Sequence, residues 1–145
     1  MKTSEIKHFI TEYTDEVWNK GNVEAMDRFY TPNYVHHDIS RPDLQTLDHY
    51  KDWAKDLLAG LQDFHVAIDD LVAEDGKAVK RWTASGIHNN TFAGIPATGK
   101  QVSFCGVSTY RLEGDKISES WYLYDLLGLL QQLGVIPLPE TVENK

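Results

Sequence analysis

The periodicity of the apolar residues changes near the middle of the chain. Ile6, Phe9, Ile10, Tyr13 and Val17 recur at helical spacing, and the same three-to-four rhythm returns over residues 47–61. From residue 64 onward the apolar residues alternate, and Glu-Asp-Gly-Lys at 74–77 is typical of a hairpin turn. Helices followed by antiparallel strands predict an α+β fold, in which the helices pack on one face of a curved sheet.

The same patterns give approximate boundaries. We expect helices over 4–20, 23–30 and 47–61, a short extended segment over 34–39, and strands over 64–68, 77–89, 100–112 and 117–125. Such long strands must twist, and helices that close the concave side leave a pocket at the wide end of a cone. Without linkers or repeats, residues 1–145 are expected to form a single domain, with a core over 5–135 and a tail over 136–145.

Composition excludes several classes of partner. The formal charge of −8 and the lack of a basic cluster argue against nucleic acid and anionic membranes. The single cysteine, Cys105, is expected to be an inert core thiol and indicates a reducing cytoplasm. We find no signal-peptide pattern and no 18-residue apolar run, so we expect a cytoplasmic protein. No metal-ligand spacing occurs, so we do not expect a metal site.

Asp125 ends the last predicted strand. Strict alternation places Ile117, Trp121, Leu123 and Asp125 on one face, which should be the interior because three of the four are apolar. A carboxyl group at the rim of such an apolar site tends to have a raised pKa and can transfer protons. The alternative is that Asp125 caps the helix that follows it.

Several short motifs occur together in the second half of the chain. They are Arg-Trp-Thr at 81–83, Gly-Ile-His at 86–88, Phe-Ala-Gly-Ile-Pro-Ala-Thr-Gly-Lys at 92–100, Gly-Asp-Lys-Ile at 114–117, Trp121, Asp125 and Gly-Leu-Leu-Gln-Gln-Leu-Gly at 128–134. Over residues 5–135 this series resembles the SnoaL-like polyketide cyclases, also called ester cyclases, of the NTF2-like superfamily. Two departures, Ile87 and the Asn-Asn pair at 89–90, stand where smaller residues are expected around the histidine and alter the pocket shape expected there.

The resemblance implies an α+β cone, usually dimeric through the exposed sheet face. It also implies closure of a ring by an intramolecular aldol reaction without metal or cofactor, with the acid/base aspartate at the end of the final strand, Asp125 here. Such a reaction needs a base to remove a proton next to a carbonyl group and a donor to stabilise the enolate. By analogy, Asp125 is the base.

Two histidines are candidates for contacts with the substrate. His88 shares its strand phase with Trp82, so it is predicted to point into the cavity and donate to the enolate; the alternative is a loop-entry histidine bonded to backbone. Of the adjacent His36 and His37, His37 alternates with the apolar residues 35 and 39 and is the inward candidate, although the pattern favours a structural histidine over a catalytic one.

The remaining candidates are aromatic or charged. Trp82, Phe104, Tyr110 and Trp121 offer flat apolar surfaces for a planar substrate, or belong to the core. Arg111 either orients a substrate carbonyl or pairs with Glu119 across the hairpin. The helical Trp18 and Trp53 are expected only to pack.

The sequence therefore predicts a homodimeric SnoaL-like cyclase of lyase or isomerase type that acts on a hydrophobic, enolisable, polyketide-like small molecule. A non-catalytic domain for ligand binding or dimerisation is the alternative. Epoxide hydrolysis on a similar cone is a further possibility, but it needs an Asp–Arg–Asp set of which only Asp125 and Arg111 can be placed.

Overall fold

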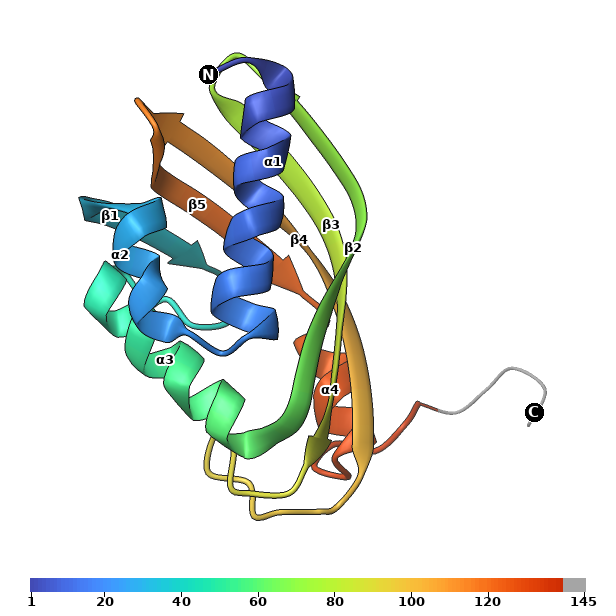
Figure 1. Ribbon diagram of the computed structural model, residues 1–145. Helices are drawn as coiled ribbons and strands as arrows, with labels where there is room; N and C mark the ends of the chain where they lie inside the picture. The colour runs from blue at the N-terminus through green and yellow to red at the C-terminus, as the bar shows by residue number, and fades with distance from the viewer. Residues whose placement is uncertain (140–145) are drawn as a thin grey trace.

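Five strands form one curved sheet whose concave face is covered by helices (Figure 1). In this computed structural model, which describes residues 1–139, the strand order is β1-β5-β4-β3-β2. The strands are β1 Tyr30–Asp38, β2 Leu61–Glu74, β3 Lys77–His88, β4 Gln101–Glu113 and β5 Lys116–Tyr124. Strands β2 to β5 are antiparallel, as predicted. Strand β1 pairs with β5 in parallel, so the expectation of a wholly antiparallel sheet was wrong at this edge.

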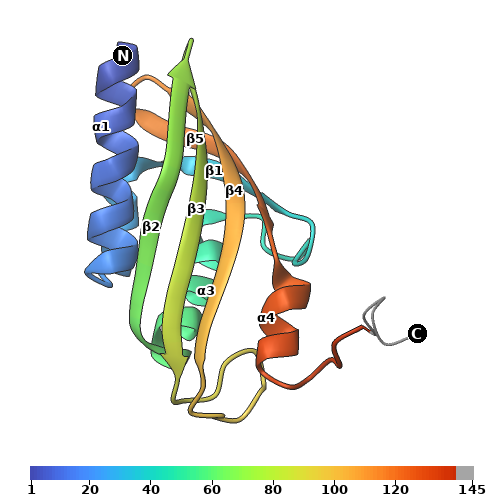
Figure 2. The same ribbon diagram turned by 90° about the vertical axis from the view of Figure 1, so that its right-hand side faces the viewer.

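The first helix changes its winding halfway. α1 covers Thr3–Tyr13 and continues as a π-helix over Thr14–Asn19, where one continuous α-helix was expected. A 3₁₀ turn at Val23–Ala25 and α2 at Met26–Phe29 lead into β1, and α3 covers Leu47–Gly60. The short α4, Leu126–Gln132, lies beside β4 near one end of the sheet, whereas α3 lies behind the strands in Figure 2.

Strand β5 contains a bulge that sets the orientation of its side chains. Ile117 pairs with Leu112, but Glu119 pairs with Arg111, so Ser118 is an additional residue without its own partner. Ile117 and Ser118 are both buried, and beyond them the even-numbered residues face inward. Tyr122 and Tyr124 therefore reach the interior, while Trp121 and Leu123 are exposed.

The end of the predicted tail, residues 140–145, lies outside the described residues. Within residues 1–139, no helix combines the length and the apolar character needed to cross a bilayer.

A glycine on β4 allows a large aromatic residue to lie against the sheet. Gly106 pairs with Trp82 on β3, and a Cβ atom at position 106 would lie 2.4 Å from Cζ2 of Trp82 and 2.9 Å from the Leu123 carbonyl oxygen. The indole nitrogen of Trp82 donates to the Ser108 hydroxyl at 2.9 Å. Only glycine fits at this point, so Gly106 determines how Trp82 is placed on the concave face.

We expect Gly106→Ala to lower the free energy of unfolding by about 1–3 kcal/mol, because the added methyl group would force Trp82 out of position. Urea unfolding measures the change. The matched control is Ser103→Ala on the same strand, whose side chain is exposed on the other face and whose effect should stay within about 0.5 kcal/mol. Equal effects for the two variants would contradict the close approach of Trp82.

Candidate functional site

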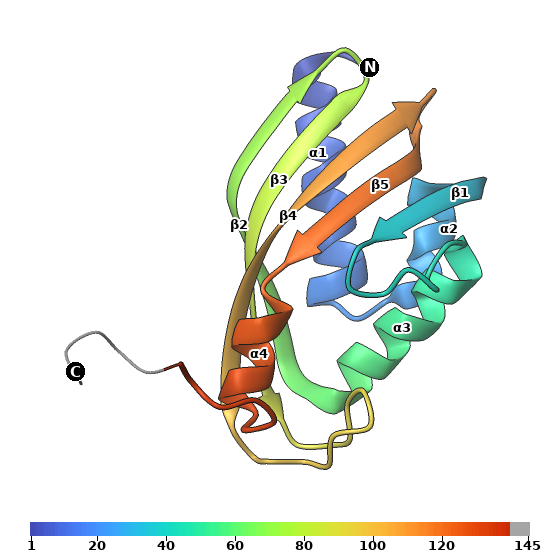
Figure 3. The same cartoon turned by 180° about the vertical axis from the view of Figure 1, so that it is seen from behind.

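A cavity lies between the concave face of the sheet and α3, which Figures 1 and 3 show on that side. The wall is largely aromatic and draws on every strand as well as on α3 and the π-helix. It consists of Trp18, His36, Asp38, Tyr50, Trp53, Leu57, Phe64, Val66, Lys80, Trp82, Phe104, Tyr122 and Tyr124. Such a wall suits a planar apolar ligand.

Besides tyrosines, three ionisable side chains interrupt this wall. His36 and Asp38 come from β1, where even-numbered residues face inward, and Lys80 comes from the inward phase of β3. Their exposed fractions are only 3%, 6% and 2%. Buried ionisable groups that line a cavity are typical of functional sites.

His36 is held by aromatic neighbours. Its Nδ1 lies 2.7 Å from the Tyr34 hydroxyl, which also bonds the Ser120 hydroxyl. The imidazole stacks on Tyr50, with ring centroids 4.1 Å apart. Burial, with a smaller contribution from His37, lowers the pKa of His36 to about 3. The ring is therefore neutral at pH 7 and offers one N–H donor and one acceptor.

Asp38 lies at the end of β1. Its Oδ1 accepts a hydrogen bond from the Ser40 backbone N–H at 2.8 Å. Burial raises the pKa of Asp38, and hydrogen bonds from the Ser40 and Arg41 amides and from Tyr124 oppose the rise. Burial and the nearby Asp38 charge also raise the pKa of Tyr124. Asp38 is thus a stronger base than an exposed carboxylate.

Tyrosine hydroxyl groups meet around Tyr122. The Tyr50 hydroxyl donates to that of Tyr122 at 2.7 Å, and the hydroxyls of Tyr13 and Tyr110 lie 3.2 and 3.5 Å from it. The Trp18 indole N–H donates to Tyr13 at 2.8 Å. Burial raises the pKa of Tyr50, Tyr110 and Tyr122, so these phenols stay protonated at neutral pH and can donate hydrogen bonds.

Asp125 does not occupy the predicted place. Its side chain is exposed, is not part of the cavity wall, and accepts a hydrogen bond from the Gly128 N–H at 2.9 Å as the N-cap of α4. The alternative of a helix cap is therefore what the structure contains. The inward orientation was wrong because the β5 bulge shifts the alternation by one residue beyond Ile117.

His37 and Trp121 also face outward, contrary to expectation. Trp121 is 41% exposed, and its ring stacks on His37 at an interplanar angle of 9°. His37 Nε2 lies 2.6 Å from Oε2 of Glu119, and Arg111 donates to Oε1 of Glu119 at 3.0 Å. These residues line the outer face, where Arg111 makes the cross-strand pair that was its alternative role. His37 was misplaced because the apolar residues that share its phase are themselves exposed.

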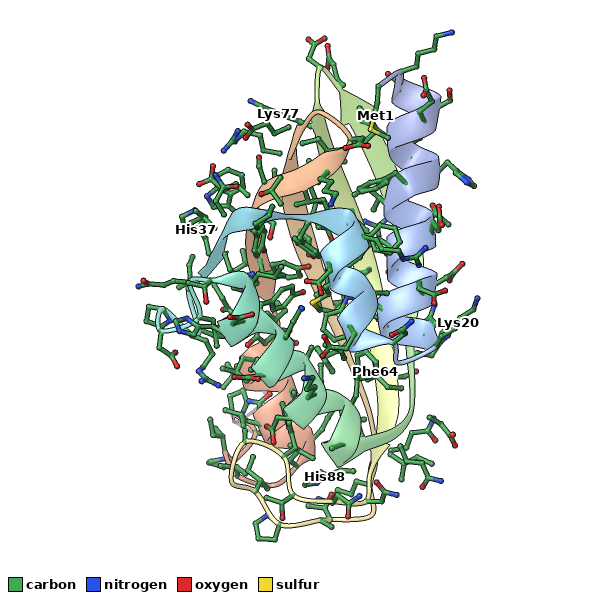
Figure 4. The ribbon with its side chains drawn as sticks, turned by 60° about the vertical axis from the view of Figure 1, so that its left-hand side comes forward. Met1, Lys20, His37, Phe64, Lys77 and His88 are labelled. Atoms are coloured by element: carbon green, nitrogen blue, oxygen red, sulfur yellow. The ribbon has the colours of Figure 1, made fainter. Side chains whose placement is uncertain are left out.

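His88 has the predicted strand phase but lies away from the cavity. It is fully buried and is not part of the wall. Its Nδ1 accepts a hydrogen bond from the Thr98 N–H at 3.2 Å and lies 2.9 Å from the Thr98 hydroxyl. Figure 4 shows His37 and His88 in separate parts of the molecule, with His88 at the end of the sheet beside the 89–100 loop. His88 is therefore a histidine at the entry to the loop that is bonded to backbone, which was the alternative interpretation.

The predicted aromatic residues divide into two groups. Trp82 and Phe104 lie in the cavity wall, whereas Tyr110 is buried next to it and reaches the wall through Tyr122. Trp18 and Trp53, expected only to pack, also line the cavity, because the π-helix and α3 face the sheet across it. Cys105 is exposed, so the core-thiol expectation was wrong.

Sequence reasoning missed His36, Asp38, Lys80 and Tyr122 as wall residues. A usable signal exists for β1, since Tyr34, His36 and Asp38 continue the phase of the buried Tyr30. Lys80 shares its phase with the predicted Trp82, but a lysine between apolar residues is normally assigned to solvent. Among residues 1–139, no group of three or more histidine, cysteine or carboxylate side chains is placed to hold a metal ion.

Comparison with known proteins identifies the family. The model of the SnoaL-like polyketide cyclase family matches residues 8–133, so the chain belongs to that family. No curated protein sequence shows significant similarity to it. The family resemblance and the NTF2-like α+β fold predicted from the sequence are thereby confirmed.

Solved structures of other proteins share this fold. A candidate polyketide cyclase from Acidithiobacillus ferrooxidans is 33% identical, with a TM-score of 0.81 over 92% of this chain and 98% of that one. TsrD from Streptomyces laurentii is 26% identical, with a TM-score of 0.83 over 94% and 99%. AclR from Streptomyces galilaeus, described as a candidate hydroxylase, is 23% identical and shares the fold, with a TM-score of 0.87 over 99% and 89%.

The electrostatics of His36 predict a pH effect on stability. Its pKa falls from 6.5 to about 3 on folding, so between these values the unfolded chain binds more protons than the folded one. The free energy of unfolding should therefore decrease as the pH falls through this window, by about 1.4 kcal/mol per pH unit for this group. His36→Phe, which keeps a ring beside Tyr50, should lose that part of the slope in urea unfolding at several pH values.

Asp38 has the opposite effect, because its pKa is raised on folding and its contribution is lost as the pH rises. The wild type and His36→Phe both retain Asp38. The difference between their slopes of unfolding free energy against pH therefore isolates the contribution of His36. His8→Gln, a change at an exposed histidine of α1, is the control. Identical slopes for wild type and His36→Phe would mean that the imidazole is not held neutral by burial.

Proposed function

We propose that this chain is a cyclase of lyase or isomerase type that performs cofactor-independent acid/base chemistry on an apolar, enolisable, polyketide-like molecule. The proposal is supported by the family and by one observation above all: a buried carboxyl group, Asp38, and a buried neutral imidazole, His36, lie in the wall of the same aromatic cavity. Ionisable groups with opposite pKa perturbations in one pocket are a common basis for proton transfer.

In the proposed reaction, the Asp38 carboxylate removes a proton from the carbon next to a substrate carbonyl group. The enolate oxygen then accepts hydrogen bonds from the Tyr122 hydroxyl and from the imidazole of His36. The enolate carbon attacks a second carbonyl carbon of the same molecule and forms the ring bond. Asp38 returns its proton to the new alkoxide, so the protein ends in its starting state. General base catalysis of this kind contributes roughly 10²- to 10⁴-fold.

Asp125 has no part in this mechanism because its exposed carboxylate caps α4. Epoxide hydrolysis is not proposed either. The cavity wall contains Asp38 but no arginine, and Arg111 lies on the other face of the sheet with Glu119.

A simple enolisable ketone can test the proton transfer without knowledge of the natural substrate. We expect the protein to accelerate deuterium exchange at C2 of 1-tetralone in D₂O, measured by NMR. Asp38→Asn should reduce the acceleration at least about 100-fold while 1-tetralone still binds, because the amide cannot accept the proton. The matched control is Asp125→Asn, which retains a capping side chain and should exchange at the wild-type rate.

The outcomes separate the candidate functions. Loss of exchange in Asp125→Asn but not in Asp38→Asn would refute the assignment of the base. Saturable binding of 1-tetralone without any acceleration by the wild type would refute catalysis on enolisable ketones and favour the non-catalytic binding domain.

We propose further that the outer face of the sheet binds a second copy of the chain. Apolar side chains from four strands are exposed there: Val35, Val79, Val107, Trp121 and Leu123. Contiguous exposed apolar side chains are typical of interaction surfaces. Three of the charged residues on this face neutralise one another, since Glu119 bonds both His37 and Arg111, which lowers the cost of removing them from water. Helix α4 lies beside β4 near one end of the sheet (Figure 2), and the outward side chains of Ser103 and Cys105 next to it remain exposed.

Trp121→Glu should convert the dimer into a monomer, because it places an unpaired charge in the centre of the contact. Size-exclusion chromatography with light scattering measures the mass, which should be twice that of the chain for the wild type and equal to it for the variant. Leu138→Glu changes an exposed apolar residue away from the sheet and should remain dimeric. A monomeric wild type at high concentration would contradict this assembly.

A further inference from the structure

Lys80 is a buried cation in the cavity wall. Its exposed fraction is 2%, and its ammonium group donates to the Thr14 hydroxyl at 3.0 Å. The Nζ atom also lies over two aromatic rings, 5.3 Å from the centroid of Tyr13 and 5.5 Å from that of Tyr110. The π-helix supplies Thr14 and α1 supplies Tyr13, so the first helical segment forms one side of this site.

The ammonium group has no opposite charge beside it. No carboxylate of residues 1–139 lies within 4 Å of Lys80 Nζ, although nine other pairs of basic and acidic side chains do meet within that distance. The hydroxyl groups beside the ammonium, those of Thr14 and Tyr110, are both uncharged acceptors. The two cation–π contacts offset only part of the free energy that the ammonium loses on desolvation.

The hydroxyl groups near Lys80 can also stabilise an anion. One of the two rings under Lys80 belongs to Tyr110. Its hydroxyl lies 3.5 Å from that of Tyr122, which is a wall residue. Lys80 opposes the rise that burial causes in the pKa of Tyr110, as expected for a positive charge close to that phenol. A cation and a protonated phenol in one cavity wall together attract an anionic oxygen.

We propose that Lys80 and the Tyr122 hydroxyl form an oxyanion subsite that binds the ionised form of an acidic enol or phenol. The inference rests on the proposed function and narrows its substrate class: the ligand carries a 1,3-dicarbonyl or phenolic group next to a flat apolar portion. The bound anion supplies the missing counter-charge of Lys80. The subsite in turn places the anionic oxygen against the aromatic wall. It favours the enolate over the neutral ketone, and Lys80 acts by charge rather than by taking a proton.

Binding of two matched probes tests this inference without any turnover. The first is 1-phenylbutane-1,3-dione, an aromatic diketone whose ionised form has a distinct absorption spectrum. The second is butyrophenone, which has similar size but no acidic proton between two carbonyl groups. Absorbance titration against pH gives the apparent pKa of the bound diketone. We expect the wild type to lower it by at least about one unit, which is tenfold tighter binding of the enolate than of the neutral form.

Lys80→Met keeps a long unbranched side chain and removes the charge. It should abolish the preference for the ionised diketone while leaving the affinity for butyrophenone unchanged. The matched control is Lys77→Met, an exposed lysine near the hairpin end of the same strand, labelled in Figure 4, which should behave as wild type. Replacement of an uncompensated buried charge by an apolar group should not destabilise the fold, and thermal unfolding checks this point.

Several results would overturn the subsite. An unchanged or raised pKa of the diketone bound to the wild type would do so even if Lys80→Met failed to fold. Equal losses of affinity for both probes in Lys80→Met would show that the lysine only supports packing. Asp38→Asn separates this inference from the proposed catalysis, because it removes the base but should still lower the pKa of the bound diketone.

Discussion

The arrangement of the cavity depends on one additional residue in β5. Ser118 has no partner on β4, and beyond it the side chains of β5 change faces. Tyr122 and Tyr124 consequently point into the cavity, and Trp121 and Leu123 point to the outer face. A slip of one residue would exchange these two sets completely, because side chains alternate with a period of two. The bulge therefore fixes the aromatic wall inside and the apolar patch outside at the same time.

Strand β1 takes its orientation from β5. The parallel register pairs His36 with Ser120 and Asp38 with Tyr122, so the inward phase of β5 is transmitted to the neighbouring strand. The two ionisable groups of β1 thereby reach the cavity at its edge strand, where Tyr34 bonds both His36 and Ser120. Burial of such groups is costly, and it is tolerated here because tyrosine hydroxyls and backbone amides satisfy most of their hydrogen bonds.

The sequence was sufficient for the elements but not for their faces. Helical spacing located α1 and α3, and alternation with a Glu-Asp-Gly-Lys turn located the β2–β3 hairpin within a few residues. The orientation of β1 and β5 was predicted wrongly, because apolar residues occupy both faces of these strands and a strand that is apolar on both sides gives no inward phase. Neither the bulge at Ser118 nor the parallel pairing of β1 has a local signal, since both depend on contacts between distant segments.

The motifs that identify the family and the residues that line the cavity overlap only in part. Asp125 and Gly128 both belong to the motif series, but here they contact each other at the start of α4. A Cβ atom at position 128 would lie 2.2 Å from Oδ2 of Asp125, so the glycine makes room for the capping carboxylate. His36, Asp38 and Lys80 lie outside those motifs. AclR has the same fold and is described as a candidate hydroxylase, so the fold does not determine the reaction. The chemistry of this chain must instead be argued from the ionisable groups of β1 and β3, which a motif comparison passes over.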